Sequence, residues 1–197
     1  MDALPFAQGE FDVIWSEEAI YNIGFEAGVS AWSHFLKPGG KLVVSEITWL
    51  TTTRPAAIQS HGEIEYPEID VASAKIGILE RHGYSPEAYF VLPVHCWLEN
   101  YYRPMQGRFD AFLERHDGSD GAKSVVEAER LEIALYEKYR DYYSYGVYVA
   151  KKNRGLTPQG KDCLPQGIDP APVIRSESNP ARSLGPIYHQ LKRRGLY

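Results

Sequence analysis

A strand–helix–strand pattern near the start of the chain constrains the fold most strongly. A short apolar run, Phe11–Trp15, is followed by apolar residues at helical spacing between Glu18 and Leu36. Lys37-Pro38-Gly39-Gly40 then ends the predicted helix, because proline cannot continue it and glycine readily adopts positive φ. A second apolar run, Lys41–Ile47, follows directly. Two strands joined through a helix form a βαβ unit, so the pattern predicts a parallel sheet with a right-handed crossover.

The next part of the chain continues the alternation of helices and strands. The spacing predicts a helix over Val71–His82, a strand over Glu87–Leu92, a long helix over Lys123–Tyr143 and a strand over Tyr145–Ala150. The predicted core face of the long helix consists of Val126, Ala128, Leu131, Ala134, Leu135 and Tyr139. The fold class is therefore α/β.

The composition changes abruptly after Asn153. The 44 residues from Arg154 onward contain six prolines and five glycines and show no hydrophobic period. Such a segment buries too little apolar surface to offset the entropy of ordering it. We therefore expect a folded domain over residues 1–152 and a disordered, basic tail over residues 153–197.

Charge and cysteine content exclude several classes of protein. The net charge is −5, and because the tail from Arg154 carries +4, the remaining part of the chain carries −9. An acidic body argues against nucleic acid as a partner. The two cysteines, Cys96 and Cys163, lie far apart, and the six histidines lack the spacing of a zinc site. No apolar run approaches the roughly 18 residues of a membrane helix. We expect a cytoplasmic protein without a metal or a membrane anchor.

Three stretches resemble class I S-adenosylmethionine-dependent methyltransferases. Leu4-Pro5-Phe6, followed by Phe11–Ser16, is similar to the passage that leads into the family's fourth strand. Phe35–Leu42 is similar to the "LKPGG-x-L" turn before its fifth strand. The third stretch is the strand–helix–strand arrangement that ends at Ala150. The resemblance covers roughly residues 1–152.

The resemblance implies a particular part of the family's sheet. The family's strand order is 3-2-1-4-5-7-6, and this chain begins just before the fourth strand. It implies a partial Rossmann-like sheet of strands 4-5-7-6 with flanking helices, without the first strand and its glycine-rich cofactor loop. Phe11–Ser16 would then be an exposed edge. We expect a marginally stable chain unless the missing N-terminal half or a homodimer partner covers that side.

Candidate site residues follow from the resemblance and from the rule that ligands bind beyond the carboxyl ends of parallel strands. The cofactor-binding candidates are Leu4, Trp15, Ser16 and Glu17, and the substrate-binding candidates are Glu18, Tyr21, Glu46 and Trp49. Ser16 has an alternative role as the N-cap of the following helix, where Glu17 and Glu18 would favour the positive helix end. Core packing is the alternative for Tyr21 and Trp49.

The resemblance implies methyl transfer from S-adenosylmethionine to a small molecule, because Trp15–Phe25 is similar to a bacterial small-molecule subgroup. Catalysis of this kind depends mainly on alignment and desolvation. Glu18 or Glu46 would serve as a base only if the acceptor must lose a proton, so no catalytic residue is predicted. One alternative is a truncated, non-catalytic remnant that binds a partner through the open sheet edge. Another is a different Rossmann-like enzyme.

Overall fold

The computed structural model describes residues 5–154, which fall into two compact units. The described parts of unit 1 are residues 5–52, 68–91 and 144–154, and those of unit 2 are residues 53–67 and 92–143. Leu4 and the tail from Gly155 onward lie outside the described residues. The cofactor-binding role of Leu4 and the disorder of the tail therefore stay predictions, as does the domain boundary at residue 152.

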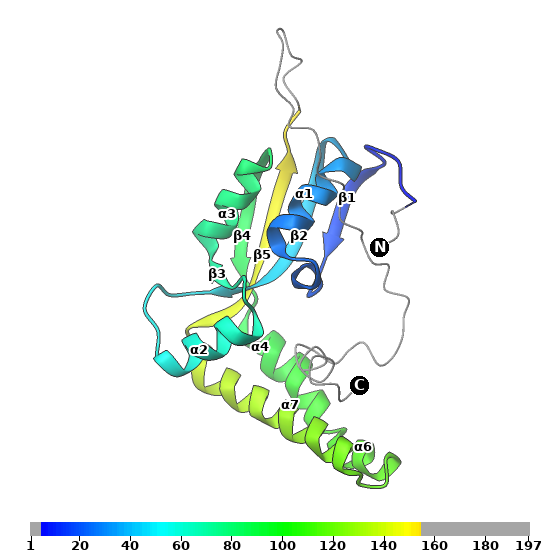
Figure 1. Cartoon of the computed structure of the whole chain (residues 1–197), viewed down its shortest axis with the longest axis vertical. Coiled ribbons are helices and arrows are strands. Elements are labelled where there is room, and N and C mark those ends of the chain that lie inside the picture. Colours follow the sequence, from blue (N-terminus) through cyan, green and yellow to red (C-terminus); the bar gives the residue numbers. More distant parts are fainter. Residues whose placement is uncertain (1–4, 155–197) are drawn as a thin grey trace. The chain divides into compact units, whose positions relative to one another are not determined.

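Unit 1 is built on a mixed sheet whose strand order is β1-β2-β5-β4 (Figure 1). These strands are β1 (Phe11–Ser16), β2 (Leu36–Trp49), β5 (Tyr143–Lys152) and β4 (Tyr84–Val91). β1 and β2 run parallel, whereas β4 and β5 run antiparallel. A short strand, β3 (Asp70–Val71), pairs with the end of β2. The order matches the predicted 4-5-7-6 arrangement, and the α/β fold class is confirmed.

The helix between β1 and β2 is shorter than predicted. A single 3₁₀ turn, Ile20–Asn22, precedes α1 (Phe25–Phe35), and Gly24 separates the two with a φ of 89°. A positive φ cannot lie inside an α-helix, so the continuous helix predicted from Glu18 was wrong. α1 does end before Lys37-Pro38-Gly39-Gly40, but these residues form an irregularity within β2, where Gly39 has a φ of 84°.

One face of the sheet carries the core of unit 1. α1 and α3 (Ala72–Arg81) both pack on this face, where Leu42 and Val44 of β2 are completely buried (Figure 1). The buried cluster consists of Ile20, Phe25, Val29, Ala31, Trp32, Phe35, Leu36, Leu42, Val44, Leu79, Tyr84, Tyr148 and Ala150. Because side chains alternate along a strand, the neighbouring residues of β2 point to the other face.

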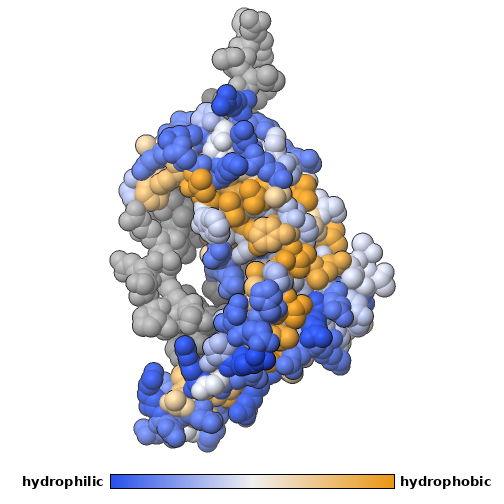
Figure 2. Space-filling view, turned by 180° about the vertical axis from the view of Figure 1, so that it is seen from behind, coloured by the Kyte–Doolittle hydropathy of each residue, from blue (hydrophilic) through white to orange (hydrophobic). Residues whose placement is uncertain are grey.

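The other face of the sheet leaves large apolar side chains exposed. Trp15 pairs in register with Val43, and Phe90 pairs with Val147, so these side chains lie opposite the helices. Trp15 is 65% exposed and Phe90 is 50% exposed. Figure 2 views the protein from behind and shows hydrophobic side chains gathered over the sheet. We call this surface the open face, and it contains Val13, Trp15, Val43, Phe90 and Val147.

Unit 2 consists of helices. Its elements are α2 (Ala56–Glu65), α4 (Val94–Trp97), a π-helix (Leu98–Tyr102), α5 (Arg103–Gln106), α6 (Phe109–Arg115) and α7 (Asp120–Tyr139). Ser119 caps α7, because its hydroxyl accepts a hydrogen bond from the backbone N–H of Ala122 at 3.4 Å. The pattern of the sequence predicted α7 but not the shorter helices.

The buried face of α7 overlaps only in part with the predicted one. Leu131 is 61% exposed and Ala134 is also exposed, whereas Ile133 and Tyr136 are buried. Tyr136 stacks on Trp97 with ring centroids 4.5 Å apart. Aromatic rings contribute large buried areas and therefore set the orientation of the helix. The predicted face was therefore correct at Val126 and Tyr139, which are buried, and wrong at Leu131 and Ala134.

Candidate functional site

The carboxyl ends of β1 and β2 lie at the same edge of the sheet because the two strands are parallel. Ser16, the last residue of β1, pairs in register with Val44 of β2. Two residues further on, the backbone N–H of Glu18 donates a hydrogen bond to Ser45 Oγ at 2.9 Å. The segment after β1 is thereby fastened to the neighbouring strand. This edge is the place where parallel α/β sheets bind ligands.

Glu18 has an unusual backbone conformation at this edge. Its φ is 48°, which lies in the left-handed region that residues other than glycine rarely adopt. Such a residue costs on the order of 1–3 kcal/mol and tends to occur at functional sites. The side chain is exposed as a whole, but desolvation of its carboxylate and the charge of Glu17 raise its pKa. Ser16, Glu17 and Glu18 thus lie at the end of β1, and their ligand-binding roles stay predictions.

Ser16 is not a helix cap, contrary to the alternative considered from the sequence. The residue before α1 is Gly24, and the side chain that satisfies the helix end belongs to Glu68. The backbone N–H of Phe25 donates to Glu68 Oε2 at 2.7 Å. A Cβ at Gly24 would lie 2.6 Å from Glu68 Oε1, and the φ of 89° also favours glycine at this position. A carboxylate at this position also favours the positive end of the helix.

Glu46 lies near the end of β2 but points into the helix-covered side of the sheet. It is 1% exposed, and its Oε1 lies 3.8 Å from the ammonium group of Lys75, which is also 1% exposed. Lys75 Nζ donates to the carbonyl oxygen of Glu68 at 2.7 Å and lies 4.6 Å from the ring centroid of Phe25. Glu46 Oε2 has no hydrogen-bond partner within residues 5–154.

Burial governs the ionisation of this pair. Removal of Glu46 from water raises its pKa to about 7, although the positive charge of Lys75 acts in the opposite direction. Burial also lowers the pKa of Lys75, against the nearby carboxylates of Glu46 and Glu68. A carboxyl group that titrates near neutral pH can both accept and donate a proton. Glu46 is thus a buried carboxyl group whose pKa lies near neutral pH, and its role in proton transfer stays a prediction.

The three aromatic candidates differ in exposure. Trp15 lies on the open face, Tyr21 is half-buried in the 3₁₀ turn, and Trp49 is 3% exposed at the end of β2. Trp15 is therefore accessible to a ligand as the structure stands, whereas core packing accounts for Trp49. The ligand-binding roles of Trp15, Tyr21, Glu46 and Trp49 stay predictions.

Sequence reasoning did not identify Lys75 or Glu68 as part of this cluster. Lys75 lies on the buried side of a predicted helix, where an isolated lysine is rare. That rarity was a usable signal, because a buried lysine needs an acidic partner. The role of Glu68 depends on a contact 43 positions away in the chain, which no local pattern shows.

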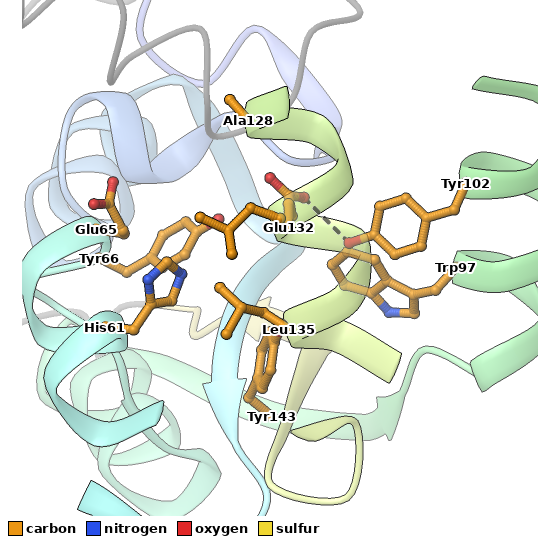
Figure 3. Close-up of a pocket in the computed structure, with 10 residues that line it drawn as sticks. His61, Glu65, Tyr66, Trp97, Tyr102, Ala128, Glu132, Leu135 and Tyr143 are labelled. Atoms are coloured by element: carbon orange, nitrogen blue, oxygen red, sulfur yellow. Dashed lines mark hydrogen bonds between the residues drawn. The ribbon is translucent and has the colours of Figure 1, made fainter. Parts of the chain in front are cut away.

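A pocket lies within unit 2 (Figure 3). Its walls come from α2, α7, the segment Trp97–Tyr102 and the start of β5. The lining residues are His61, Glu65, Tyr66, Trp97, Tyr102, Ala128, Leu131, Glu132, Leu135 and Tyr143. The hydroxyl group of Tyr102 donates a hydrogen bond to Glu132 Oε1 at 3.1 Å. None of the predicted site residues lies in this pocket.

The described part of the chain offers neither a metal cluster nor a membrane-spanning helix. Residues 5–154 contain no cluster of three or more histidine, cysteine, aspartate or glutamate side chains that would hold a metal ion. Over the same range, no helix has the length and apolar character required to cross a membrane.

Comparison with known proteins gives matches of structure but not of sequence. No protein-family model matches the chain, and no curated protein sequence does. A methyltransferase from Geobacter sulfurreducens, solved with S-adenosylhomocysteine, matches with a TM-score of 0.61 and 17% identity over 74% of this chain and 59% of its own. The [4+2]-cyclase SpnF matches with a TM-score of 0.58 and 18% identity over 79% of this chain and 55% of its own.

Phosphoethanolamine N-methyltransferase 2 of Haemonchus contortus, solved with S-adenosylmethionine, also matches. Its TM-score is 0.57 at 16% identity, and the match covers 75% of this chain and 34% of that enzyme. The chain thus spans between about a third and three fifths of the length of these proteins. Identities this low show a shared fold, and the fold does not by itself fix the chemistry.

Proposed function

We propose that this chain, which has the fold of class I S-adenosylmethionine-dependent methyltransferases, takes part in methyl transfer from S-adenosylmethionine to a small molecule. The observation that carries the proposal is the edge where β1 and β2 end. The sheet has the strand order that the resemblance implies, β1-β2-β5-β4. At this edge Glu18 has a strained backbone conformation, and its N–H donates a hydrogen bond to Ser45. Structures with this fold are solved with S-adenosylmethionine or S-adenosylhomocysteine.

The residues at this edge suit the charge of the proposed cofactor. S-adenosylmethionine carries a sulfonium and an ammonium group, and it supplies an electrophilic methyl group. Glu17 and Glu18 offer carboxylates, and Trp15 offers an exposed aromatic ring; each of these groups attracts cations. These residues would hold the methionine end of the cofactor. The whole reaction is a proposal, because the chain spans only part of the proteins that it matches.

Glu46 is the residue that we propose as the general base. An acceptor that must lose a proton needs a base with a pKa close to the working pH, and the pKa of Glu46 is about 7. The ammonium group of Lys75 lies 3.8 Å from Glu46 Oε1 and stabilises the charged carboxylate. An acceptor that is already nucleophilic needs no such base, so the pH profile of the reaction reports on the type of acceptor.

Calorimetric titration of the purified chain with S-adenosylmethionine tests the proposal. We expect binding with a dissociation constant of roughly 1–100 μM, equivalent to about 5–8 kcal/mol. Trp15→Ala should weaken binding at least about tenfold, because it removes an aromatic contact to a cation. Phe90→Ala is the matched control, since Phe90 is an exposed aromatic of the open face on another strand. No binding at millimolar cofactor, or equal effects of the two variants, would refute the proposed site.

A second candidate function is an interaction module without catalysis. It is favoured by β1, which pairs only with β2 within residues 5–154 and thus presents a strand edge. Val13 and Trp15 on this strand are 50% and 65% exposed. Such edges add strands from other chains. Absence of cofactor binding together with self-association would favour this function. The low cysteine content supports a cytoplasmic location for either function.

A further inference from the structure

We infer that the pocket in unit 2 binds an organic ammonium group. The inference goes beyond the proposed function in that it concerns a second site made of other residues.

Aromatic rings form much of the pocket lining. Tyr66, Trp97, Tyr102 and Tyr143 contribute rings, and His61 adds an imidazole. Figure 3 shows Trp97 and Tyr102 on one side of α7, with His61 and Tyr66 on the other. The rings on the first side are held rigidly, because Trp97 stacks on Tyr136 and lies 5.7 Å from Tyr102 between centroids. The electron-rich faces of fixed aromatic rings attract cations, organic ammonium groups above all.

The charged groups of the lining are acidic. Glu65 and Glu132 are two of the ten lining residues, and none of the ten is lysine or arginine. Tyr102 fixes the carboxylate of Glu132 through its hydrogen bond of 3.1 Å. Burial and the negative charge of Glu132 both raise the pKa of Tyr102 and of Tyr143, so the two phenols stay neutral donors. The pocket thus combines a held carboxylate with uncharged rings.

Other classes of ligand fit this lining poorly. A phosphate or carboxylate would meet Glu65 and Glu132, and like charges repel strongly where water is partly excluded. A bare metal ion requires more oxygen or nitrogen ligands than these side chains supply. A purely apolar ligand would desolvate the carboxylates without replacing their hydration. An ammonium group with alkyl substituents suits this lining, because the aromatic rings and the negative charge of the carboxylates both attract a cation.

The experiment compares two probes of nearly equal shape on the full chain. Choline carries a trimethylammonium group, and 3,3-dimethylbutan-1-ol replaces its nitrogen by carbon and is neutral. Calorimetry at constant ionic strength, without any cofactor, should detect choline binding at least about tenfold tighter than that of the alcohol. Equal binding of the two probes, or no binding of choline at about 20 mM, would overturn the inference.

Two variants assign the effect to the pocket. Glu132→Gln keeps an oxygen that accepts the hydrogen bond of Tyr102 but removes the charge, so it should weaken choline binding about tenfold and leave the alcohol unchanged. Glu137→Gln on the same helix is the matched control, because Glu137 is exposed and outside the lining. If Glu132→Gln does not fold, Glu65→Gln takes its place. Choline binding that is unaffected by both lining variants would contradict the assignment.

The same samples separate this inference from the proposed function. Titration of the Glu132→Gln variant with S-adenosylmethionine should give the binding of the unchanged protein, since the proposed cofactor residues lie in unit 1. Choline binding without cofactor binding would support the ammonium site and refute the proposed function. Cofactor binding without a preference for choline over the alcohol would support the proposed function and overturn the ammonium site.

Discussion

The two faces of the sheet in unit 1 are made from the same strands but have different environments. On the helix-covered face, Leu42 and Val44 are completely buried beneath α1 and α3. On the open face, Val13 and Trp15 are 50% and 65% exposed, although they are as apolar as their counterparts. Exposed apolar patches of this kind are typical of surfaces that bind a ligand or another protein. Apolar residues along a strand thus show that a face of the strand can be buried, but they do not show that another element covers it.

Matched valine truncations give the largest expected difference between the two faces. Val44→Ala should lower the free energy of unfolding by about 2–3 kcal/mol, because it removes buried methyl groups and leaves a cavity. Val13→Ala should change it by less than about 0.5 kcal/mol, as is usual for exposed positions. Urea unfolding followed by circular dichroism measures both values. A comparable loss in both variants would mean that the open face is covered in solution.

Gly24→Ala tests how much the turn before α1 and its contact with Glu68 contribute to the stability of unit 1. Gly24→Ala should destabilise the protein by about 1–3 kcal/mol, because of the positive φ and the contact with Glu68 Oε1. Gly77→Ala in α3 is the control: the nearest atom to its Cβ would be 3.6 Å away, on the side chain of Arg81. That variant should be neutral or stabilise the helix by up to about 1 kcal/mol. Thermal unfolding of the two variants under identical conditions measures the difference, and equal melting temperatures would refute the anchoring role.

The buried Glu46 should make stability depend on pH. Its folded pKa of about 7 exceeds the ordinary value of 4.5 for this carboxyl group, so the folded state holds a proton that the unfolded state has already lost. The free energy of unfolding should therefore fall as pH rises from about 4.5 to 7, by about 3 kcal/mol, since one pKa unit corresponds to about 1.4 kcal/mol. Glu46→Gln should remove this contribution, whereas Glu80→Gln, at an exposed position of α3, should retain it. Parallel pH profiles for all three proteins would contradict the raised pKa.

The open face should affect association more than stability. We expect the melting temperature of the unchanged chain to rise with protein concentration, because a second copy would cover Val13 and Trp15. Trp15→Lys should reduce that dependence and alter the unfolding free energy of the dilute protein by less than about 0.5 kcal/mol. Sedimentation velocity over a range of concentrations provides the check. A sharp, reversible transition without any concentration dependence would show that the chain needs no partner on this side.

The framework of unit 1 could be predicted from the sequence because local signals specify it. Phe11–Trp15 and Lys41–Ile47 are short, strongly apolar segments, and the proline and glycines between them stop α1 at Phe35. The register at the bulge could not be predicted, since Phe11 pairs with Leu36 but Val13 pairs with Lys41. Irregular pairing of this kind depends on both strands at once.

Local signals identify only those residues of the candidate site that follow a strand end, because the other contacts depend on segments far apart in the sequence. Ser16, Glu17 and Glu18 follow a strand end, and a strand end can be recognised locally. The environment of Glu46 depends on Lys75, and the N-terminus of α1 depends on Glu68. These partners return to the sheet only after the excursion through residues 53–67, so their contacts are set by tertiary packing. The pocket lining of unit 2 comes from four separate segments and has no local signature.

The short pairing between β2 and β3 has a consequence for the evolution of such chains. Thr48 pairs with Asp70 and Trp49 with Val71, so the polypeptide leaves the sheet and rejoins it at neighbouring points. Loop closure costs little more for a long insertion than for a short one once its ends are held together. Lineages can therefore exchange or lengthen the helical excursion between these points and leave the frame of the sheet intact. The residues of α2 that line the pocket can therefore change without altering the strand order.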